Sequence, residues 1–260
     1  DLPNSPGDVG RADLNGDGTL DLAVSGYLEI PRTPAAAIVL QVPGRGYQDS
    51  GWALTGYGEA LASAADWNGD SWNDLLFTGE NPRVAGTTFL TNWQFSALAP
   101  AGVTLTNLAR AACAWGDLDN DGDLDLIITG EEGSRQGMRT RLFLNRDGEL
   151  AETASALPDT AGAVLLGDFD NDGDLDVFLT QFPLLTPFSL NSLHLNLGDG
   201  SFTNSGRTFP RSAFLFSGAG DFDGDGDLDI VASEGASGLT LLRNDAGSNH
   251  PPSAPTGLRA

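Results

Sequence analysis

The feature that most constrains this chain is a nine-residue, aspartate-rich window that occurs five times. The five windows are DLNGDGTLD (13–21), DWNGDSWND (66–74), DLDNDGDLD (117–125), DFDNDGDLD (168–176) and DFDGDGDLD (221–229). Their first residues are 53, 51, 51 and 53 positions apart. A fixed period of this length is typical of repeat architectures in which each repeat is one supersecondary unit. The sequence therefore predicts five units of about 52 residues in a chain of 260 residues.

The segments around each window have the character of short β-strands. Small residues precede the windows at 8–12, 61–65, 111–116, 163–167 and 215–220. Apolar runs follow them at 20–26, 74–79, 124–130, 175–180 and 228–233. A third set lies at 37–42, 87–92, 141–145, 192–196 and 239–244, and weaker fourth segments lie at 46–52, 148–153 and 200–205. Short strands between Gly, Asn and Asp turns, without a helical apolar period, indicate an all-β protein.

Four strands in a unit of this length are typical of a propeller blade. We therefore predict a β-propeller of five four-stranded blades, each with one aspartate-rich loop. No clear fourth strand follows 239–244, so the last blade is expected to be incomplete. Residues 245–255 could supply an edge strand despite their prolines, the blade could have three strands, or the ring could be larger. We favour a closed five-bladed ring in which strands 8–12 and 212–220 are neighbours.

The charged residues exclude several classes of function. The formal net charge is −23, and all 13 basic residues are arginine. Nucleic-acid binding requires a basic surface, so nucleic acid is excluded as a partner, and so is any lysine-based chemistry. The chain has two histidines and one cysteine, which excludes a disulfide framework and a Cys/His zinc site. No apolar run approaches the ~18 residues of a membrane helix, so we expect no membrane insertion.

The acidic residues are concentrated where they can bind a cation. The windows hold 21 of the 28 aspartates, and positions 1, 3, 5 and 9 of each are carboxylates or carboxamides. Position 6 is glycine in four of the five, which permits the left-handed backbone that curls a loop around an ion. A shell of about six oxygen ligands describes Ca²⁺ rather than Zn²⁺, and it suits Mg²⁺ less well. An EF-hand is excluded because position 12 is apolar in every window.

The DxDxDGxxD windows, each followed by a strand such as LDLIITG (124–130), resemble the FG-GAP/VCBS repeat family over residues 1–245. The resemblance implies an integrin-like propeller with one Ca²⁺ per blade, up to five in all. Side-chain ligands would come from positions 1, 3, 5 and 9, and a backbone carbonyl from position 7. The implied ligands are Asp13, Asn15, Asp17, Thr19, Asp21; Asp66, Asn68, Asp70, Trp72, Asp74; Asp117, Asp119, Asp121, Asp123, Asp125; Asp168, Asp170, Asp172, Asp174, Asp176; and Asp221, Asp223, Asp225, Asp227, Asp229.

The second window and the C-terminal tail depart from the repeat. Ser71 stands at the glycine position and Asn73 where the other windows have leucine, so the pattern supports this calcium site least. Residues 246–260 are proline-rich and resemble the beginning of a fibronectin type III domain, so we expect a linker into a domain that is missing here. The first residues, DLPNSPGDVG, are expected to belong to a mature or excised form. We therefore expect a module of a larger extracellular protein, secreted or on the cell surface.

These features favour a calcium-binding, non-catalytic module that binds a glycan or an extracellular protein, expected to be a monomer. We expect no catalytic or cofactor-binding residues. The alternatives are a propeller domain of a polysaccharide-degrading enzyme and a structural spacer. The absence of lysine, with only two histidines and three tyrosines, weighs against an enzyme that removes a sugar-ring proton.

The remaining unusual residues are assigned to packing. Trp67, Trp115 and Cys113 are expected in the core. Trp72 is expected to face solvent as a partly covered surface aromatic, with ligand stacking as the alternative. His194 alternates with Leu193 and Leu195 and is expected on the opposite face of its strand.

Overall fold

The computed structural model describes residues 5–29, 32–81, 84–133, 137–181, 191–210, 216–233 and 238–245. These residues form 19 β-strands and no helix, so the all-β prediction is confirmed. The tail at 246–260, where the fibronectin-like segment is predicted, lies outside the described residues. Residues 212–215 of the predicted last inner strand lie outside them too, and the closure of a ring stays a prediction.

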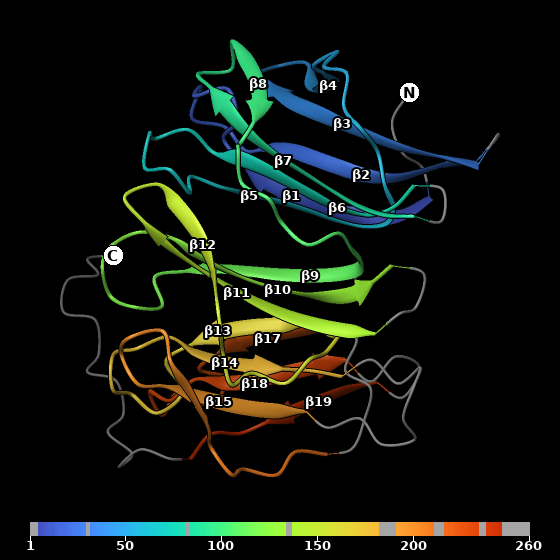
Figure 1. Cartoon of the computed structure of the whole chain (residues 1–260). Helices are drawn as coiled ribbons and strands as arrows, with labels where there is room; N and C mark the ends of the chain where they lie inside the picture. Colours follow the sequence, from blue (N-terminus) through green and yellow to red (C-terminus); the bar gives the residue numbers. More distant parts are fainter. Residues whose placement is uncertain are drawn as a thin grey trace, which may run out of the picture. The chain divides into compact units, whose positions relative to one another are not determined.

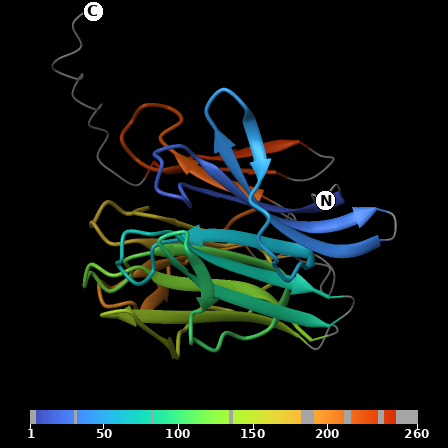
Figure 2. The same cartoon turned by 90° about the horizontal axis from the view of Figure 1, so that it is seen from above.

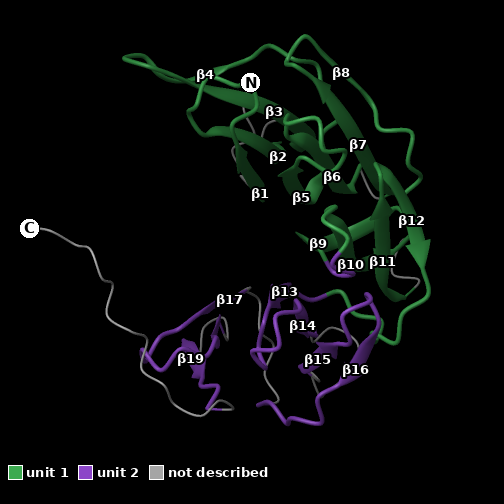
Figure 3. Cartoon of the chain, turned by 90° about the vertical axis from the view of Figure 1, so that its left-hand side faces the viewer, with its two compact units in different colours: residues 1–117, 121–161 green, residues 118–120, 162–260 purple. Residues whose placement is uncertain are grey.

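The strands form five antiparallel sheets, and each sheet is a meander in which consecutive strands are hydrogen-bonded neighbours (Figure 1 and Figure 2). Four sheets have four strands, and the fifth has three among the described residues. These are the five blades of a β-propeller, so both the predicted fold class and the incomplete last blade are confirmed. We number the blades 1 to 5 in chain order. The chain divides into two compact units, residues 1–117 with 121–161 and residues 118–120 with 162–260 (Figure 3).

The first unit contains blades 1 to 3. Blade 1 consists of β1 (Ser5–Ala12), β2 (Asp21–Glu29), β3 (Arg32–Val42) and β4 (Gly46–Asp49). Blade 2 consists of β5 (Gly58–Ala65), β6 (Asp74–Glu80), β7 (Ala85–Trp93) and β8 (Ala97–Pro100). Blade 3 consists of β9 (Leu108–Gly116), β10 (Asp125–Glu132), β11 (Met138–Arg146) and β12 (Glu149–Thr153). The first strands of these blades pack side by side, β1 against β5 and β5 against β9.

The second unit contains blades 4 and 5. Blade 4 consists of β13 (Val164–Gly167), β14 (Asp176–Leu179), β15 (Ser192–Asn196) and β16 (Phe202–Asn204). Blade 5 consists of β17 (Phe216–Gly220), β18 (Asp229–Ser233) and β19 (Leu239–Leu242). Here too the first strands, β13 and β17, are in contact.

Strand β8 is an element that the sequence analysis did not predict. The other fourth strands follow turns marked by glycine, whereas β8 follows the turn Gln94–Phe95. Both of these residues have φ of 53°, the left-handed conformation that usually favours glycine. Because no glycine marks this turn, nothing in the local sequence signals the hairpin.

The cores lie between successive blades of each unit. Blades 2 and 3 share a cluster that includes Trp67, Phe89, Leu126 and Phe143. Blades 1 and 2 share one that includes Leu14, Ile38 and Phe77, and blades 4 and 5 share one around Phe169, Phe178 and Ile230. In each cluster, position 2 of an aspartate-rich window contributes a side chain, namely Leu14, Trp67 or Phe169. The window therefore anchors the core as well as carrying carboxylates.

In blades 2 to 5, a buried asparagine near the end of the third strand bonds to the preceding aspartate-rich window. Its Nδ2 donates to the backbone oxygen of position 2 in the preceding window. The four bonds are Asn92 to Leu14 (2.9 Å), Asn145 to Trp67 (2.5 Å), Asn196 to Leu118 (2.8 Å) and Asn244 to Phe169 (2.7 Å). We call these residues the latch asparagines.

The latch asparagines should contribute strongly to stability. In Asn196→Ala, the backbone oxygens of Leu118 and Leu175 lose the hydrogen bonds from the side-chain amide. The loss of these two bonds and of the buried amide is expected to reduce the free energy of unfolding by roughly 2–4 kcal/mol in total. Urea unfolding measures the effect. The control Asn204→Ala removes an exposed asparagine of the same blade and should cost less than about 1 kcal/mol. Equal losses in the two variants would contradict the latch.

Candidate metal site

The five aspartate-rich windows form loops at the same place in every blade, between the first and second strands. We call them aspartate loops 1 to 5 and number their positions from 1 to 9. Positions 4 and 6 have positive φ in all five loops. Position 4 is Gly16, Gly69, Asn120, Asn171 and Gly224, with φ between 59° and 79°. Position 6 is Gly18, Ser71, Gly122, Gly173 and Gly226, with φ between 72° and 99°.

This backbone turns amide groups toward the carboxylate at position 1. Oδ1 of Asp168 accepts hydrogen bonds from the amide of position 5, and its Oδ2 accepts one from position 6, at 3.1 and 3.0 Å. The same two bonds recur in the other four loops. Position 5 acts similarly, because Oδ1 of Asp172 accepts the amide of position 7 at 3.0 Å. The loops are thus held in one shape by their own backbone donors.

The carboxylate at position 9 is the buried member of each loop. The five residues Asp21, Asp74, Asp125, Asp176 and Asp229 are at most 1% exposed. Each accepts a backbone N–H from the third strand or, in blade 5, from Asn244 two residues beyond it, at 2.7–2.8 Å. In loops 1, 4 and 5 the second oxygen accepts the amide of position 2 at 2.9–3.1 Å. The carboxylate at position 9 therefore ties the loop to the third strand. In loops 1, 4 and 5 it also holds the backbone of the apolar residue at position 2.

Carboxylate oxygens converge in three of the loops. Three groups have ligand atoms within 4.8 Å of one another: Asp117, Asp119 and Asp125; Asp168, Asp170 and Asp176; Asp221, Asp223 and Asp225. Loops 1 and 2 have Asn15 and Asn68 at position 3, so a carboxamide takes the place of one carboxylate there. An all-oxygen donor set of this kind fits Ca²⁺.

The protonation equilibria of these carboxylates also fit a site for a cation. Burial raises the pKa of Asp176 to about 6, and the backbone N–H groups of Asn196 and Phe169 offset the shift only in part. Burial also raises the pKa of Asp170, as do the neighbouring carboxylates Asp172 and Asp168. A bound divalent cation would favour the charged forms that burial and mutual repulsion disfavour.

Loop 2 keeps the common shape despite its unusual residues. Ser71 adopts φ of 72° at the glycine position, and Asn73 donates from Nδ2 to the backbone oxygen of Asp13 at 3.2 Å. Oδ2 of Asp74 is buried and has no hydrogen bond of normal geometry within the described residues. Burial raises the pKa of Asp74 to about 7, and Asp70 and Asp66 add to the shift. A buried carboxylate oxygen without a well-formed hydrogen bond is the arrangement expected of a residue that binds a cation. We call this oxygen of Asp74 orphaned.

The side chains at position 7 contact a neighbouring loop. Asp174 accepts a hydrogen bond from Asn120 and Asp227 accepts one from Asn171, both at 2.8 Å. In each pair, position 4 of one loop bonds to position 7 of the next. The sequence predicts only a carbonyl role in calcium shells for Thr19, Trp72, Asp123, Asp174 and Asp227, and that role stays a prediction. The recurrence of Asn at position 4 with Asp at position 7 is the signal in the sequence for these side-chain contacts.

Trp72 occupies the same position 7 and makes the corresponding contact with its ring. A Cβ built on Gly16 would lie 2.6 Å from Cη2 of Trp72, so the ring lies directly on the backbone of loop 1. Trp72 is half-buried. The half-buried ring agrees with the expected partly covered surface aromatic, and Gly16 offers no side chain to keep the ring away.

The other residues assigned to packing are found in or against the core. Trp67 is 6% exposed and lies 5.3 Å from Phe89 between ring centroids, which confirms its core role. Trp115 is half-buried, packs against the same cluster and donates to Ser63. Cys113 is partly exposed, although burial raises the pKa of its thiol to about 12. His194 is buried beside Ser192, and burial lowers its pKa, so its imidazole is held neutral.

Fold and loops together define the class: a β-propeller whose blades each carry one aspartate loop. The FG-GAP-like repeat family matches residues 66–128 and 117–179, so the chain contains FG-GAP-like repeats, as the sequence predicted. The human protein cartilage acidic protein 1 is 26% identical over 170 residues, which is 59% of this chain and 25% of that protein. The same-named protein of Xenopus tropicalis is 28% identical over 137 residues, or 48% of this chain and 20% of that protein. The chain thus spans a quarter or less of these relatives.

A solved structure of a lectin from Agrocybe aegerita, described as recognising non-reducing terminal N-acetylglucosamine, has a similar fold. The TM-score is 0.59 and the identity 18%, over 93% of this chain and 63% of the lectin chain. At this identity the likeness concerns the fold alone. None of the described residues forms a helix long and apolar enough to cross a membrane.

The contact between Trp72 and loop 1 can be tested with a matched pair of glycines. Gly16→Ala should lose roughly 1 kcal/mol from its left-handed backbone and a further ~1–3 kcal/mol from the clash with the indole. Gly224 stands at position 4 of loop 5 with a φ of 79°. No atom lies within 4 Å of the place that the Cβ of Gly224→Ala would take. Chemical denaturation should therefore show the smaller loss for Gly224→Ala. Adding Trp72→Ser should remove the difference, and equal losses without it would refute the contact.

Ser71 should be a strained residue that glycine relieves. Its φ of 72° carries a penalty that glycine does not have, so Ser71→Gly is expected to raise the free energy of unfolding by roughly 0.5–1 kcal/mol. The reverse change, Gly173→Ser at the same position of loop 4, should lower it by at least as much. Thermal unfolding of both variants provides the measurement, and a loss in Ser71→Gly would contradict the assignment.

Proposed function

We propose that this chain is a calcium-binding, non-catalytic propeller module that binds an extracellular glycan or protein. Each aspartate loop would hold one Ca²⁺ through positions 1, 3, 5 and 9 and the backbone carbonyl of position 7. The ion would neutralise carboxylates that the fold brings together and would fix the loop shape. Loop 2 is included, because the orphaned oxygen of Asp74 supports an ion there.

The observation that carries this proposal is the repetition of one hydrogen-bonding pattern in five loops. Exposed aspartates scattered for solubility would not share the left-handed positions 4 and 6 or a buried carboxylate at position 9. Five bound Ca²⁺ would add ten positive charges, and the formal net charge would change from −23 to −13. The proposal therefore explains why so acidic a chain can be compact.

An extracellular setting is supported by the name of the relatives, which associates them with cartilage. Millimolar extracellular calcium also suits the weak sites of extracellular modules. Carbohydrate as ligand is supported by the lectin of similar fold, which is described as recognising N-acetylglucosamine. A monomer, secretion and adhesion belong to the same proposal.

A non-catalytic role is favoured over an enzyme. Among the described residues, His194 is buried beside the hydroxyl of Ser192, and burial disfavours the thiolate of Cys113. The buried aspartates at position 9 accept hydrogen bonds from backbone amides. A general base must reach the proton that it removes, and these buried histidine and aspartate side chains lie in the interior.

Calcium should stabilise the fold, because an ion that binds only the native state adds RT ln(1 + [L]/Kd). That amounts to about 2.7 kcal/mol per site at a hundredfold excess over Kd. We expect a higher melting temperature in millimolar Ca²⁺ than in EDTA. Asp170→Ala should lose part of this difference, whereas Asp199→Ala, an exposed turn residue outside the loops, should keep all of it. The proposal fails if calcium does not change the melting temperature of the unmodified protein.

A further inference from the structure

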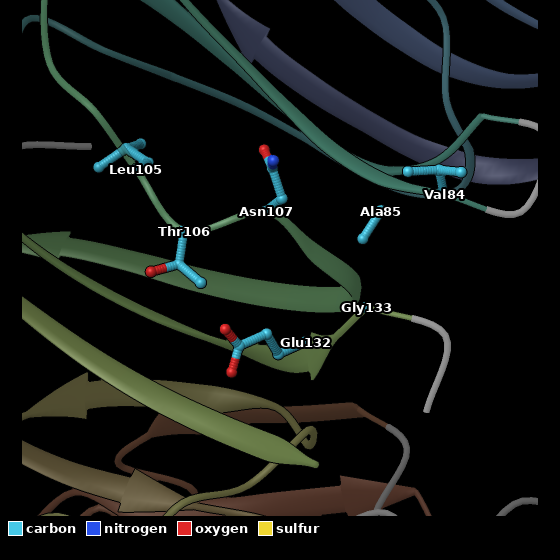
Figure 4. Close-up of a pocket in the computed structure, with 7 residues that line it drawn as sticks. All are labelled: Val84, Ala85, Leu105, Thr106, Asn107, Glu132 and Gly133. Atoms are coloured by element: carbon cyan, nitrogen blue, oxygen red, sulfur yellow. The ribbon is translucent and has the colours of Figure 1, made fainter. Parts of the chain in front are cut away.

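A pocket of about 570 Å³ lies between blades 2 and 3, at the strand ends opposite the aspartate loops. Its apolar wall is formed by Val84, Ala85 and Leu105, and its polar groups belong to Thr106, Asn107 and Glu132 (Figure 4). The volume falls within the range of about 300–1,000 Å³ typical of small-molecule sites. All of these residues belong to the first unit.

The segment that carries Thr106 and Asn107 is fixed by two buried threonine contacts. The hydroxyl of Thr78 donates to the backbone oxygen of Leu108 at 2.6 Å, and that of Thr87 donates to Thr106 at 3.1 Å. The two hydroxyls are also 2.9 Å apart. The polar side chains of the pocket therefore project from a backbone that is already held in place, which lowers the entropy lost on binding.

The carboxylate of Glu132 is oriented and neutralised by an arginine. Nε of Arg139 lies 2.7 Å from Oε2 of Glu132, and Nη1 of Arg139 is 3.8 Å from Asp159. A carboxylate paired in this way retains acceptor sites for O–H donors, but it does not need a cationic ligand. An anion would be disfavoured by the net charge of the chain.

A second ion pair fixes the spacing of the two blades at the same end. Arg110 of β9 contacts Glu59 of β5 at 2.9 Å and Glu131 of β10 at 2.7 Å. Both Glu59 and Arg110 have left-handed backbones, with φ of 45° and 47°. Strain of this kind persists where the surrounding structure enforces it, and it is concentrated at functional sites.

We infer that this pocket binds a saccharide residue. A hydroxyl, a carboxamide and a neutralised carboxylate can pair with several hydroxyl groups, and the aliphatic wall can cover the C–H face of a sugar ring. This inference rests on the proposed binding function and places it in a site that is separate from the aspartate loops. The ligand class is a neutral, polyhydroxylated ring.

The test is a titration of the full chain in millimolar calcium with galactose, glucose, N-acetylglucosamine and glucosamine, followed by NMR or calorimetry. Asn107→Ala and Glu132→Gln should each weaken binding of a neutral sugar about tenfold, the effect of losing one good hydrogen bond. Asn107 is exposed, so its removal should leave the fold intact. The matched control Glu149→Gln removes one charge at a different pocket between blades 2 and 3 and should change affinity less than about twofold.

The outcomes separate this inference from the proposed function. If a neutral sugar binds and neither Asn107→Ala nor Glu132→Gln weakens it, the pocket assignment is wrong while glycan binding stands. A loss only in Glu149→Gln would move the site to the other pocket. Binding of glucosamine alone would show that the ligand is an amine, which overturns the ligand class. If no sugar binds, both the inference and the glycan form of the proposed function fail.

Discussion

The structure depends on a buried carboxylate at the end of each aspartate loop. Removing an aspartate from water is unfavourable unless the charge is compensated. Here one oxygen accepts a backbone amide at the end of the third strand, and in three loops the other accepts the amide of position 2. The aspartate at position 9 begins the second strand and bonds to the backbone of the third strand. In loops 1 and 4 it also holds, through the amide of position 2, the apolar residue that packs in the core shared with the next blade.

This compensation is incomplete, and the shortfall links stability to metal binding. Asp176 makes both bonds and its pKa is still raised to about 6. Asp74 lacks a well-formed second bond, and its pKa is raised further, to about 7. The hydrogen bonds of the protein alone therefore leave the charged form of these two buried carboxylates disfavoured. A bound cation, as proposed above, would supply the missing stabilisation, and the loop would then be a structural element as well as a binding site.

Much of this could be predicted from the sequence, because the repeat gives five observations of one pattern. The five loops, the four-stranded blades and the incomplete last blade all follow from periodicity and turn residues. Strand β8 could not be predicted in this way, because Gln94 and Phe95 form the turn before it. They adopt a left-handed conformation that the sequence would have indicated only through a glycine. The latch asparagines were also missed, although an asparagine recurs near the end of four third strands. Their role depends on the packing of successive blades, which local patterns do not describe.

The two ends of a blade therefore carry different kinds of chemistry. At the loop end the polar groups are charged, repeated in every blade and satisfied mainly by backbone amides, so their variation is limited by the fold. At the opposite end the residues differ between blades: Glu59 and Arg110 occupy corresponding positions of β5 and β9, yet they carry opposite charges. A ligand site unique to one pair of blades can arise only where the repeat permits such differences. On the proposals made above, recognition would lie at the end opposite the aspartate loops, and those loops would hold the blades in register.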